Sequence, residues 1–76
     1  MHGAGVYFFD DDRAYFGRYF PRGDHSPGDI YISRGMTTHA TIQTMAHELC
    51  HLKQDMERRA FSEKECCIIA RQGNCG

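Results

Sequence analysis

The sequence predicts an α+β fold in which a small antiparallel sheet is followed by a long helix and a short return helix. Aromatic and β-branched runs separated by turn residues occupy the first half of the chain, which is typical of strands. Apolar residues at helical spacing follow in the second half. Ser62 and Glu65 then form a capping-box pattern that marks the start of another helix. Residues 1–76 are expected to form one domain with a small core.

Three strands are expected before the long helix. The first is the short run Val6–Phe9. The second lies within Ala14–Phe20, where a strand with a glycine bulge is favoured over a short helix and where Pro21 ends the run. The third, Asp29–Ser33, alternates between polar and apolar residues and gives the clearest strand signal.

The long helix is expected from about Thr38 to about Arg58. Either Thr37 or Thr38 can cap its N-terminus with a hydroxyl group. A second helix is expected to start at Ser62 and to end near Gln72. One stripe of the long helix is apolar and is expected to face the core; it consists of Ile42, Met45, Ala46, Leu49, Leu52 and Met56.

The most specific pattern is the H-E-x-x-H motif His47-Glu48-Leu49-Cys50-His51 in the middle of this helix. Histidines four residues apart lie one above the other on a helix face, so both imidazoles can bind one metal ion. Zinc in such a site lowers the pKa of a bound water to about 7, and Glu48 is placed to take a proton from that water. The two histidines lie on a different stripe from the apolar residues, which argues against core filling. The alternative is a surface helix with two solvated histidines.

In this setting the motif resembles the zincin metallopeptidases, in which a small antiparallel sheet precedes the active-site helix. The resemblance covers about residues 28–70 and is to small SprT-like and minimal gluzincin proteins of phages and bacteria. It implies that the edge strand of the sheet holds an extended peptide substrate beside the active site, and Asp29–Ser33 stands where this strand is expected. It also implies that a zinc ion is the cofactor and that Glu48 is the general base.

The third metal ligand is expected on the second helix. Gluzincins use the first glutamate of a pattern of the type E-x-E-A-D-x-F-A. The segment Glu63–Ala70 resembles this pattern with Glu63 in the ligand position, although Cys66 and Cys67 replace the alanine and the aspartate. SprT-like proteins use a histidine from an H-G-x-x-F segment, and the matching position here carries neither histidine nor glycine. The alternatives left open are Glu57, Glu65, Cys67 or a ligand from a second molecule.

Two further residues are weaker candidates. Gln54 follows His51 by one helical turn and is a candidate hydrogen-bond partner for that residue. Tyr31 could donate a hydrogen bond to an oxyanion, although an aromatic residue in a strand is more typical of a core.

Charge and composition narrow the range of partners. The formal net charge is −1 and no basic block is present, so nucleic-acid binding is not indicated. No segment has the length or apolarity of a membrane span, and a peptide or protein substrate is the expected partner. Because the chain is small, formation of an oligomer is a further possibility.

The four cysteines are expected to be reduced thiols in a cytoplasmic protein. Cys66 and Cys67 are adjacent, Cys50 lies inside the motif, and no export signal is visible. Pairing of Cys75 with another cysteine is the alternative.

Three functions compete at this level. The first is a zinc metallopeptidase with His47, His51 and Glu63 as ligands and Glu48 as the catalytic residue. The second is a zinc-stabilised binding or regulatory module without peptidase activity. The third is a phage factor that acts through protein contact, with incidental histidines. A site with three protein ligands and an open position favours catalysis, whereas four protein ligands favour a structural role.

Overall fold

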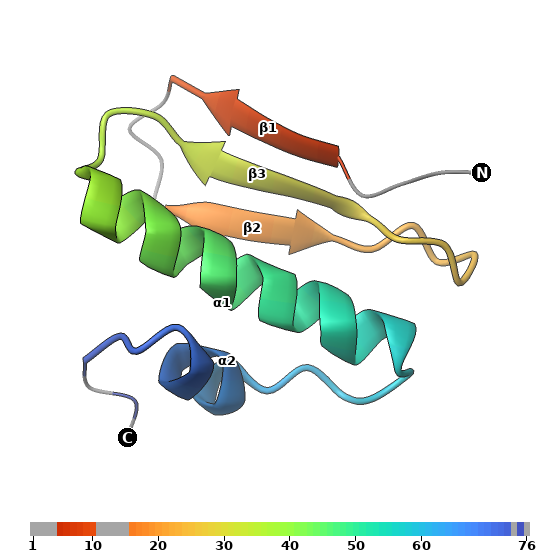
Figure 1. Cartoon of the computed structure of the whole chain (residues 1–76). Helices are drawn as coiled ribbons and strands as arrows, with labels where there is room; N and C mark the ends of the chain where they lie inside the picture. The colour runs from red at the N-terminus through yellow and green to blue at the C-terminus, as the bar shows by residue number, and fades with distance from the viewer. Residues whose placement is uncertain (1–4, 11–15, 74, 76) are drawn as a thin grey trace.

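The computed structural model describes residues 5–10, 16–73 and 75. The order of its elements confirms the α+β prediction, with three strands before two helices (Figure 1). The second strand is shorter than expected, and residues 11–15, which include the start of the predicted run, lie outside the described residues. The elements are β1 (Gly5–Phe9), β2 (Gly17–Phe20), β3 (Asp29–Ser33), α1 (Thr38–Met56) and α2 (Glu63–Ile69).

The sheet is mixed, with the strand order β1-β3-β2. β2 pairs with β3 in the antiparallel sense, so that Gly17 lies opposite Ile32. β1 runs parallel to β3, with Gly5 opposite Asp29. The prediction of an antiparallel sheet is therefore wrong for the β1–β3 pair, since β3 lies between β1 and β2 and runs in the same direction as β1.

The position of Asp29–Ser33 also differs from the expected one. This segment is the central strand β3, and its residues Ile30 and Ile32 are completely buried. β2 takes the edge position instead and lies over α1 in the region of the motif. Tyr31 points to the opposite face, where its ring lies 5.2 Å from that of Tyr7, so this residue is remote from the motif helix.

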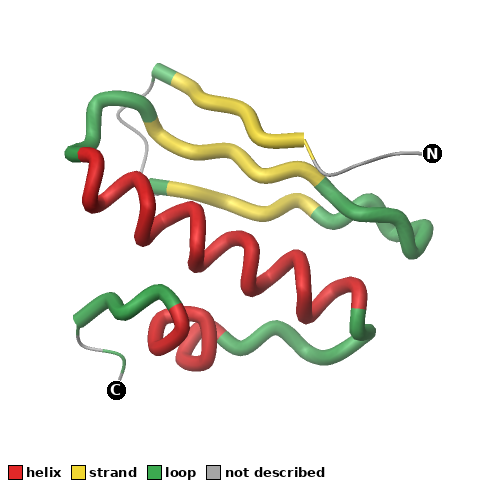
Figure 2. Tube along the Cα trace, viewed as in Figure 1, coloured by secondary structure: helices red, strands yellow, loops and turns green. Residues whose placement is uncertain are grey.

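Helix α1 lies between the sheet and α2, and Figure 2 shows these three layers in succession. Its sheet-facing side packs on a core of Tyr19, Ile30 and Ile32, to which Met36, Met45 and Leu52 add partly buried side chains. Its other side meets α2.

The predicted apolar stripe of α1 is only partly right. Met45 and Leu52 pack against the core, but Ile42 is 63% exposed and Leu49 is 44% exposed. Because α1 is covered on two sides, its polar stripe is enclosed between the layers. The residues of α1 that are buried are Thr44, Glu48, Cys50, His51 and Gln54.

The connection between the helices turns the chain back sharply. α1 ends at Met56, slightly before the predicted end, and Arg58 has the left-handed φ of 57°. Ser62 caps α2, because its hydroxyl oxygen accepts a hydrogen bond from the backbone of Glu65 at 3.2 Å. The second half of the predicted capping box does not form, since the Ser62 backbone donates to Gln54 instead. α2 ends at Ile69, one turn before the predicted end.

All four cysteines form disulfides, so the prediction of reduced thiols is wrong. Cys50 bonds to Cys66 and joins α1 to α2, whereas Cys67 bonds to Cys75 and joins α2 to the C-terminal segment. Adjacent residues on a helix point about 100° apart, so Cys66 and Cys67 can serve different partners. Reduced thiols were one reason to expect a cytoplasmic location. Disulfides are typical of oxidising compartments, so this reason no longer applies.

Neither helix in the described part of the chain combines the length and apolarity that a membrane span needs.

Candidate metal centre

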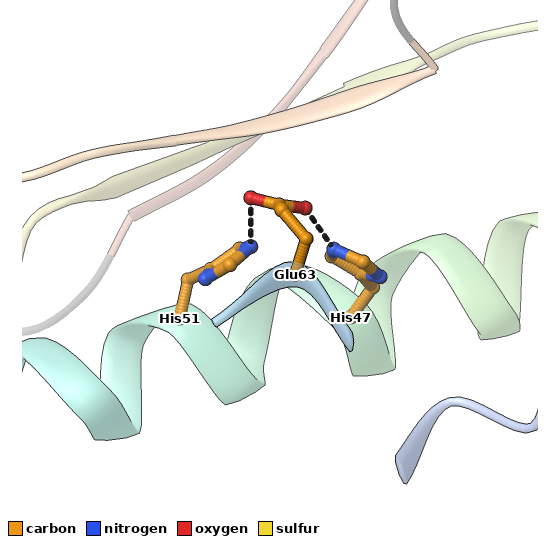
Figure 3. Close-up of side chains that lie close together, drawn as sticks. All are labelled: His47, His51 and Glu63. Carbon is orange, nitrogen blue, oxygen red and sulfur yellow. Dashed lines mark hydrogen bonds and ion pairs between the residues drawn. The ribbon is translucent and has the colours of Figure 1, made fainter. Parts of the chain in front are cut away.

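Three predicted ligands converge at one point between the layers. His47 and His51 project from α1, and Glu63 is the first residue of α2 (Figure 3). One carboxylate oxygen of Glu63 lies 2.9 Å from Nε2 of His47, and the other lies 3.0 Å from Nε2 of His51. The candidate ligand atoms all lie within 4.8 Å of one another. This is the grouping that the motif and the second helix predict.

The chain brings these residues together by local means. The two histidines are four residues apart on one helix, so their rings lie side by side with centroids 4.9 Å apart. α1 ends at Met56, and the six residues 57–62 can span up to ~20 Å in an extended form. That length returns the chain to the level of the histidines, and the Cys50–Cys66 disulfide then fixes α2 against α1.

A buried glutamine orients the ring of His51. Oε1 of Gln54 lies 3.0 Å from Nδ1 of His51, and Nε2 of Gln54 donates to Glu65 at 2.9 Å. The bond to Glu65 fixes the amide so that its oxygen faces the histidine. An amide oxygen only accepts hydrogen bonds, so Nδ1 of His51 carries the proton. The hydrogen-bond role suggested for Gln54 by its position is therefore confirmed.

A second glutamine contacts the corresponding nitrogen of His47. Oε1 of Gln72 lies 2.8 Å from Nδ1 of His47. Gln72 follows α2 and is 25 residues from His47 in the chain, so sequence reasoning did not find it. Only a prediction of how the C-terminal segment folds back on α1 could have indicated this contact.

The orientation of both rings fits a bound cation. With Nδ1 protonated, each Nε2 turns its lone pair toward the Glu63 carboxylate. Lone pairs and carboxylate oxygens repel each other unless a proton or a metal ion lies between them. Partial desolvation opposes ionisation of the largely exposed Glu63. When Nε2 of His47 or His51 carries a proton instead of a metal, its hydrogen bond and positive charge outweigh this effect and hold the pKa of Glu63 below the usual value.

The other candidate ligands have different partners. Glu57 pairs with Arg59 at 2.8 Å, and Glu65 pairs with Arg59 at 3.1 Å. Cys67 is in a disulfide. His25 and His39 are exposed and belong to no cluster of metal-ligating side chains among the described residues.

Glu48 lies in the wall of a cleft beside the three ligands. The cleft has a volume of about 410 Å³ and is bounded by β2, Glu48, His51, Phe61 and Glu63. Glu48 is only 6% exposed. Burial raises the pKa of its carboxyl group above the usual value, and the nearby histidines reduce this effect. A carboxyl group with a raised pKa is suited to exchange protons near neutral pH.

Gly17 allows β2 to approach α1 at this point. A Cβ atom at Gly17 would collide with the methyl group of Thr44 and would lie 3.3 Å from Cγ of Glu48. The glycine therefore sets the distance between the edge strand and the motif, and it does not form the predicted bulge, because it pairs in register with Ile32.

Tyr19 and Phe61 also line the cleft and were not identified from the sequence as site residues. The hydroxyl of Tyr19 donates to Asp55 at 2.6 Å and accepts from the backbone of Gly28 at 2.8 Å. Burial, and then the Asp55 carboxylate, raise the pKa of Tyr19 to about 12. The ring of Phe61 lies edge-on to His51, with centroids 5.3 Å apart.

Comparisons with known proteins do not indicate a function. No family model, curated protein or solved structure matches this chain. The functional assignment therefore depends on the geometry of these residues.

Proposed function

We propose that this protein is a zinc-dependent metallopeptidase. His47, His51 and Glu63 are the metal ligands, and Glu48 is the general base. The observation that carries this proposal is the convergence of the two Nε2 atoms and the Glu63 carboxylate, within 4.8 Å, beside a cleft that Glu48 also lines.

The donor set suits a catalytic zinc ion. Two imidazole nitrogens and one carboxylate oxygen are a known ligand set of catalytic zinc sites. Among the described residues no fourth side chain joins the cluster, so a position stays open. When bound there, zinc would lower the pKa of a water molecule to about 7 and polarise the carbonyl group of a substrate.

Glu48 would move the proton in this reaction. Its carboxylate would accept a proton from the attacking water and then give it to the leaving amine. Its burial supports this role, because a raised pKa reduces the cost of holding the proton between the two steps.

The cleft favours an extended peptide as substrate. β2 forms one wall of the cleft, and in the described part of the chain it pairs with β3 alone. Its other edge can therefore add a further strand through backbone hydrogen bonds. Tyr19, Phe20 and Phe61 line the same cleft and favour an apolar side chain near the scissile bond.

The alternative is a zinc-stabilised binding module without peptidase activity. A metal with that role would join elements that are otherwise loosely held. Here the Cys50–Cys66 disulfide already joins α1 to α2, which favours the catalytic proposal. A cytoplasmic location, which the sequence led us to expect, would require the protein to work with reduced thiols. We propose an oxidising compartment instead.

The test compares Glu48→Gln with the wild type after both are loaded with zinc. Cleavage of a fluorogenic unfolded protein is measured together with bound zinc. Glu48→Gln is expected to keep the metal and to lose at least about 100-fold in cleavage rate, because the proton acceptor is removed. Glu57→Gln is the matched control, since Glu57 pairs with Arg59 outside the cleft, and it should cleave normally. Full activity of Glu48→Gln, or no cleavage by the zinc-loaded wild type, would refute the proposal.

A further inference from the structure

The orientation of His47 depends on a residue outside both helices. Gln72 accepts the Nδ1 hydrogen of His47 at 2.8 Å and lies after the end of α2. This contact leaves Nε2 of His47 free to face Glu63. His51 has the corresponding contact with Gln54, which lies within α1 and is completely buried. The two histidines are therefore supported very differently.

Among the described residues, a small set of contacts holds the segment that carries Gln72. Its backbone N–H donates to the carbonyl of Cys67 at 3.0 Å, and Gln43 donates to the carbonyl of Arg71 at 2.9 Å. The Cys67–Cys75 disulfide closes the segment around Gln72, and Sγ of Cys75 lies 2.9 Å from the Gln72 carbonyl oxygen. This disulfide is the covalent restraint on the segment.

The two disulfides differ in their access to solvent. Cys66 is completely buried and Cys50 is 6% exposed, so their bond is shielded from a reductant. Cys67 and Cys75 are both partly exposed. Thiol–disulfide exchange requires access to a sulfur atom, so the Cys67–Cys75 bond should be reduced first.

We propose that Gln72 is a positioning residue for His47 and that the Cys67–Cys75 disulfide holds it in place, so that reduction of this bond weakens zinc binding. This inference rests on the proposed metal centre and adds a redox control to it. Outer partners of metal-binding histidines fix the tautomer and the ring orientation, and their loss typically lowers metal affinity about 10–100-fold.

The chemical change is a two-electron reduction. A thiolate of a dithiol reductant attacks Sγ of Cys67 or Cys75, which gives a mixed disulfide and releases the other cysteine thiolate. The second thiol of the reductant then resolves the mixed disulfide. The products are two cysteine thiols on the protein and one disulfide on the reductant, with both protons supplied by the dithiol.

The first experiment reduces the whole protein under mild conditions with a phosphine, which takes oxygen from water as it is oxidised. Free thiols are then alkylated and the reagents are removed. Peptide mapping should find alkylated Cys67 and Cys75 and an intact Cys50–Cys66 bond. Competition with a chromophoric zinc chelator should show zinc affinity lower by about tenfold. Opening of Cys50–Cys66 first, or unchanged affinity after selective opening, would overturn the proposal.

Variants separate the role of Gln72 from the new thiols and from general stability. Gln72→Ala should weaken zinc binding by about 10–100-fold. The double variant C67S/C75S should weaken it by about tenfold. Mild reduction of the Gln72→Ala variant should cause no further loss of zinc affinity. Gln72→Glu should restore affinity, because a carboxylate also accepts the Nδ1 hydrogen. In zinc-loaded protein, proton NMR should show slow exchange of the His47 Nδ1 hydrogen with water in the wild type and in Gln72→Glu, but fast exchange in Gln72→Ala, because only the first two proteins keep its hydrogen-bond acceptor.

The outcomes also separate this inference from the proposed function. Tight zinc binding that is unaffected by Gln72→Ala or C67S/C75S would overturn the inference and leave the metallopeptidase proposal intact. Failure of the oxidised wild type to bind zinc would refute both. A loss of affinity in Gln72→Ala that Gln72→Glu does not restore would show a structural effect and would overturn the positioning role.

Discussion

His47 and His51 are each held at both nitrogens of the ring. Nε2 faces Glu63 in both cases, and Nδ1 contacts Gln72 or Gln54. Imidazoles that are fixed in this way present their lone pairs without first losing rotational freedom, which favours tight metal binding. The same residues explain why polar side chains occupy the interior of so small a protein.

Tyr19 gives a residue-scale prediction about alkaline stability. Its folded-state pKa of about 12 lies above the unfolded value near 10, because burial and then Asp55 disfavour the phenolate. The resulting stabilisation is complete below about pH 10 and is lost as the pH rises toward about 12. The free energy of unfolding should therefore fall by up to about 2 kcal/mol over this range.

Chemical denaturation of metal-free protein at several pH values measures this effect. Tyr19→Phe should be less stable by about 1–3 kcal/mol at pH 8, because Asp55 and the Gly28 N–H lose their partner. The free energy of unfolding of Tyr19→Phe should also show no additional fall above pH 10. Tyr31→Phe is the control, since Tyr31 lies on the other face of the sheet. An equal loss in all three proteins would show that Tyr19 does not cause it.

At the scale of the elements, local signals were predictive and non-local ones were not. Ser62 caps α2 as the sequence indicates, and Thr37, one of the two threonines that the sequence left open, caps α1 with its hydroxyl. The histidine pair could be predicted from helical spacing, and Glu63 was expected as a ligand from the resemblance of Glu63–Ala70 to the gluzincin pattern. Strand order could not be predicted, because the insertion of β3 between β1 and β2 depends on contacts distant in the chain.

The errors on α1 have a related physical cause. The apolar pattern assumes one buried face, but α1 is covered by the sheet and by α2. Gln54 and Glu48 are therefore buried although they are polar, whereas Leu49 is exposed. Sequence rules are expected to fail at functional sites, where polar groups are retained in the interior. The disulfide pairs could not be read from the sequence, because adjacent Cys66 and Cys67 bond to different elements.

Gly17 gives a prediction at the junction of β2 and α1. Gly17→Ala adds a methyl group that collides with Thr44 and approaches Glu48. The free energy of unfolding should fall by about 1–3 kcal/mol, and cleavage activity should fall with it, because the strand must move away from the helix. Thermal denaturation and the peptidase assay measure the two effects.

Two further variants test the cause of this loss. Adding Thr44→Ala should recover part of the stability, because it removes the methyl group that causes the collision. Gly73→Ala is the control, since a Cβ atom there meets nothing within 4 Å, and its stability should change by no more than about 0.5 kcal/mol. If Gly17→Ala were as stable as Gly73→Ala, the result would contradict a close contact between β2 and α1 at Gly17.

At the scale of the whole molecule, covalent links compensate for a small core. Among the residues that the structure describes, the buried apolar cluster consists of Tyr19, Ile30 and Ile32. The two disulfides restrict the unfolded chain, and the Cys50–Cys66 bond also joins the helices that carry the metal ligands. We therefore expect the metal-free oxidised protein to stay folded, with zinc as an added source of stability.

Zinc should raise the stability of the oxidised protein by mass action. At a free zinc concentration 100 times the Kd, the gain in free energy of unfolding should be about 2.7 kcal/mol. Thermal melting with zinc and after addition of a chelator measures this gain. His47→Ala should melt at the same temperature under both conditions. A wild-type melting curve that zinc does not change would contradict a specific site.

The central claim is that His47, His51 and Glu63 bind one zinc ion and leave a position open. A crystal structure of the zinc-loaded oxidised protein, with anomalous scattering measured at the zinc edge, tests this most directly. The predicted result is one anomalous peak within about 2.0–2.2 Å of both Nε2 atoms and a Glu63 oxygen, with no fourth protein ligand. A peak elsewhere, a fourth side-chain ligand, or a Glu63 carboxylate beyond about 3 Å from the metal would contradict it.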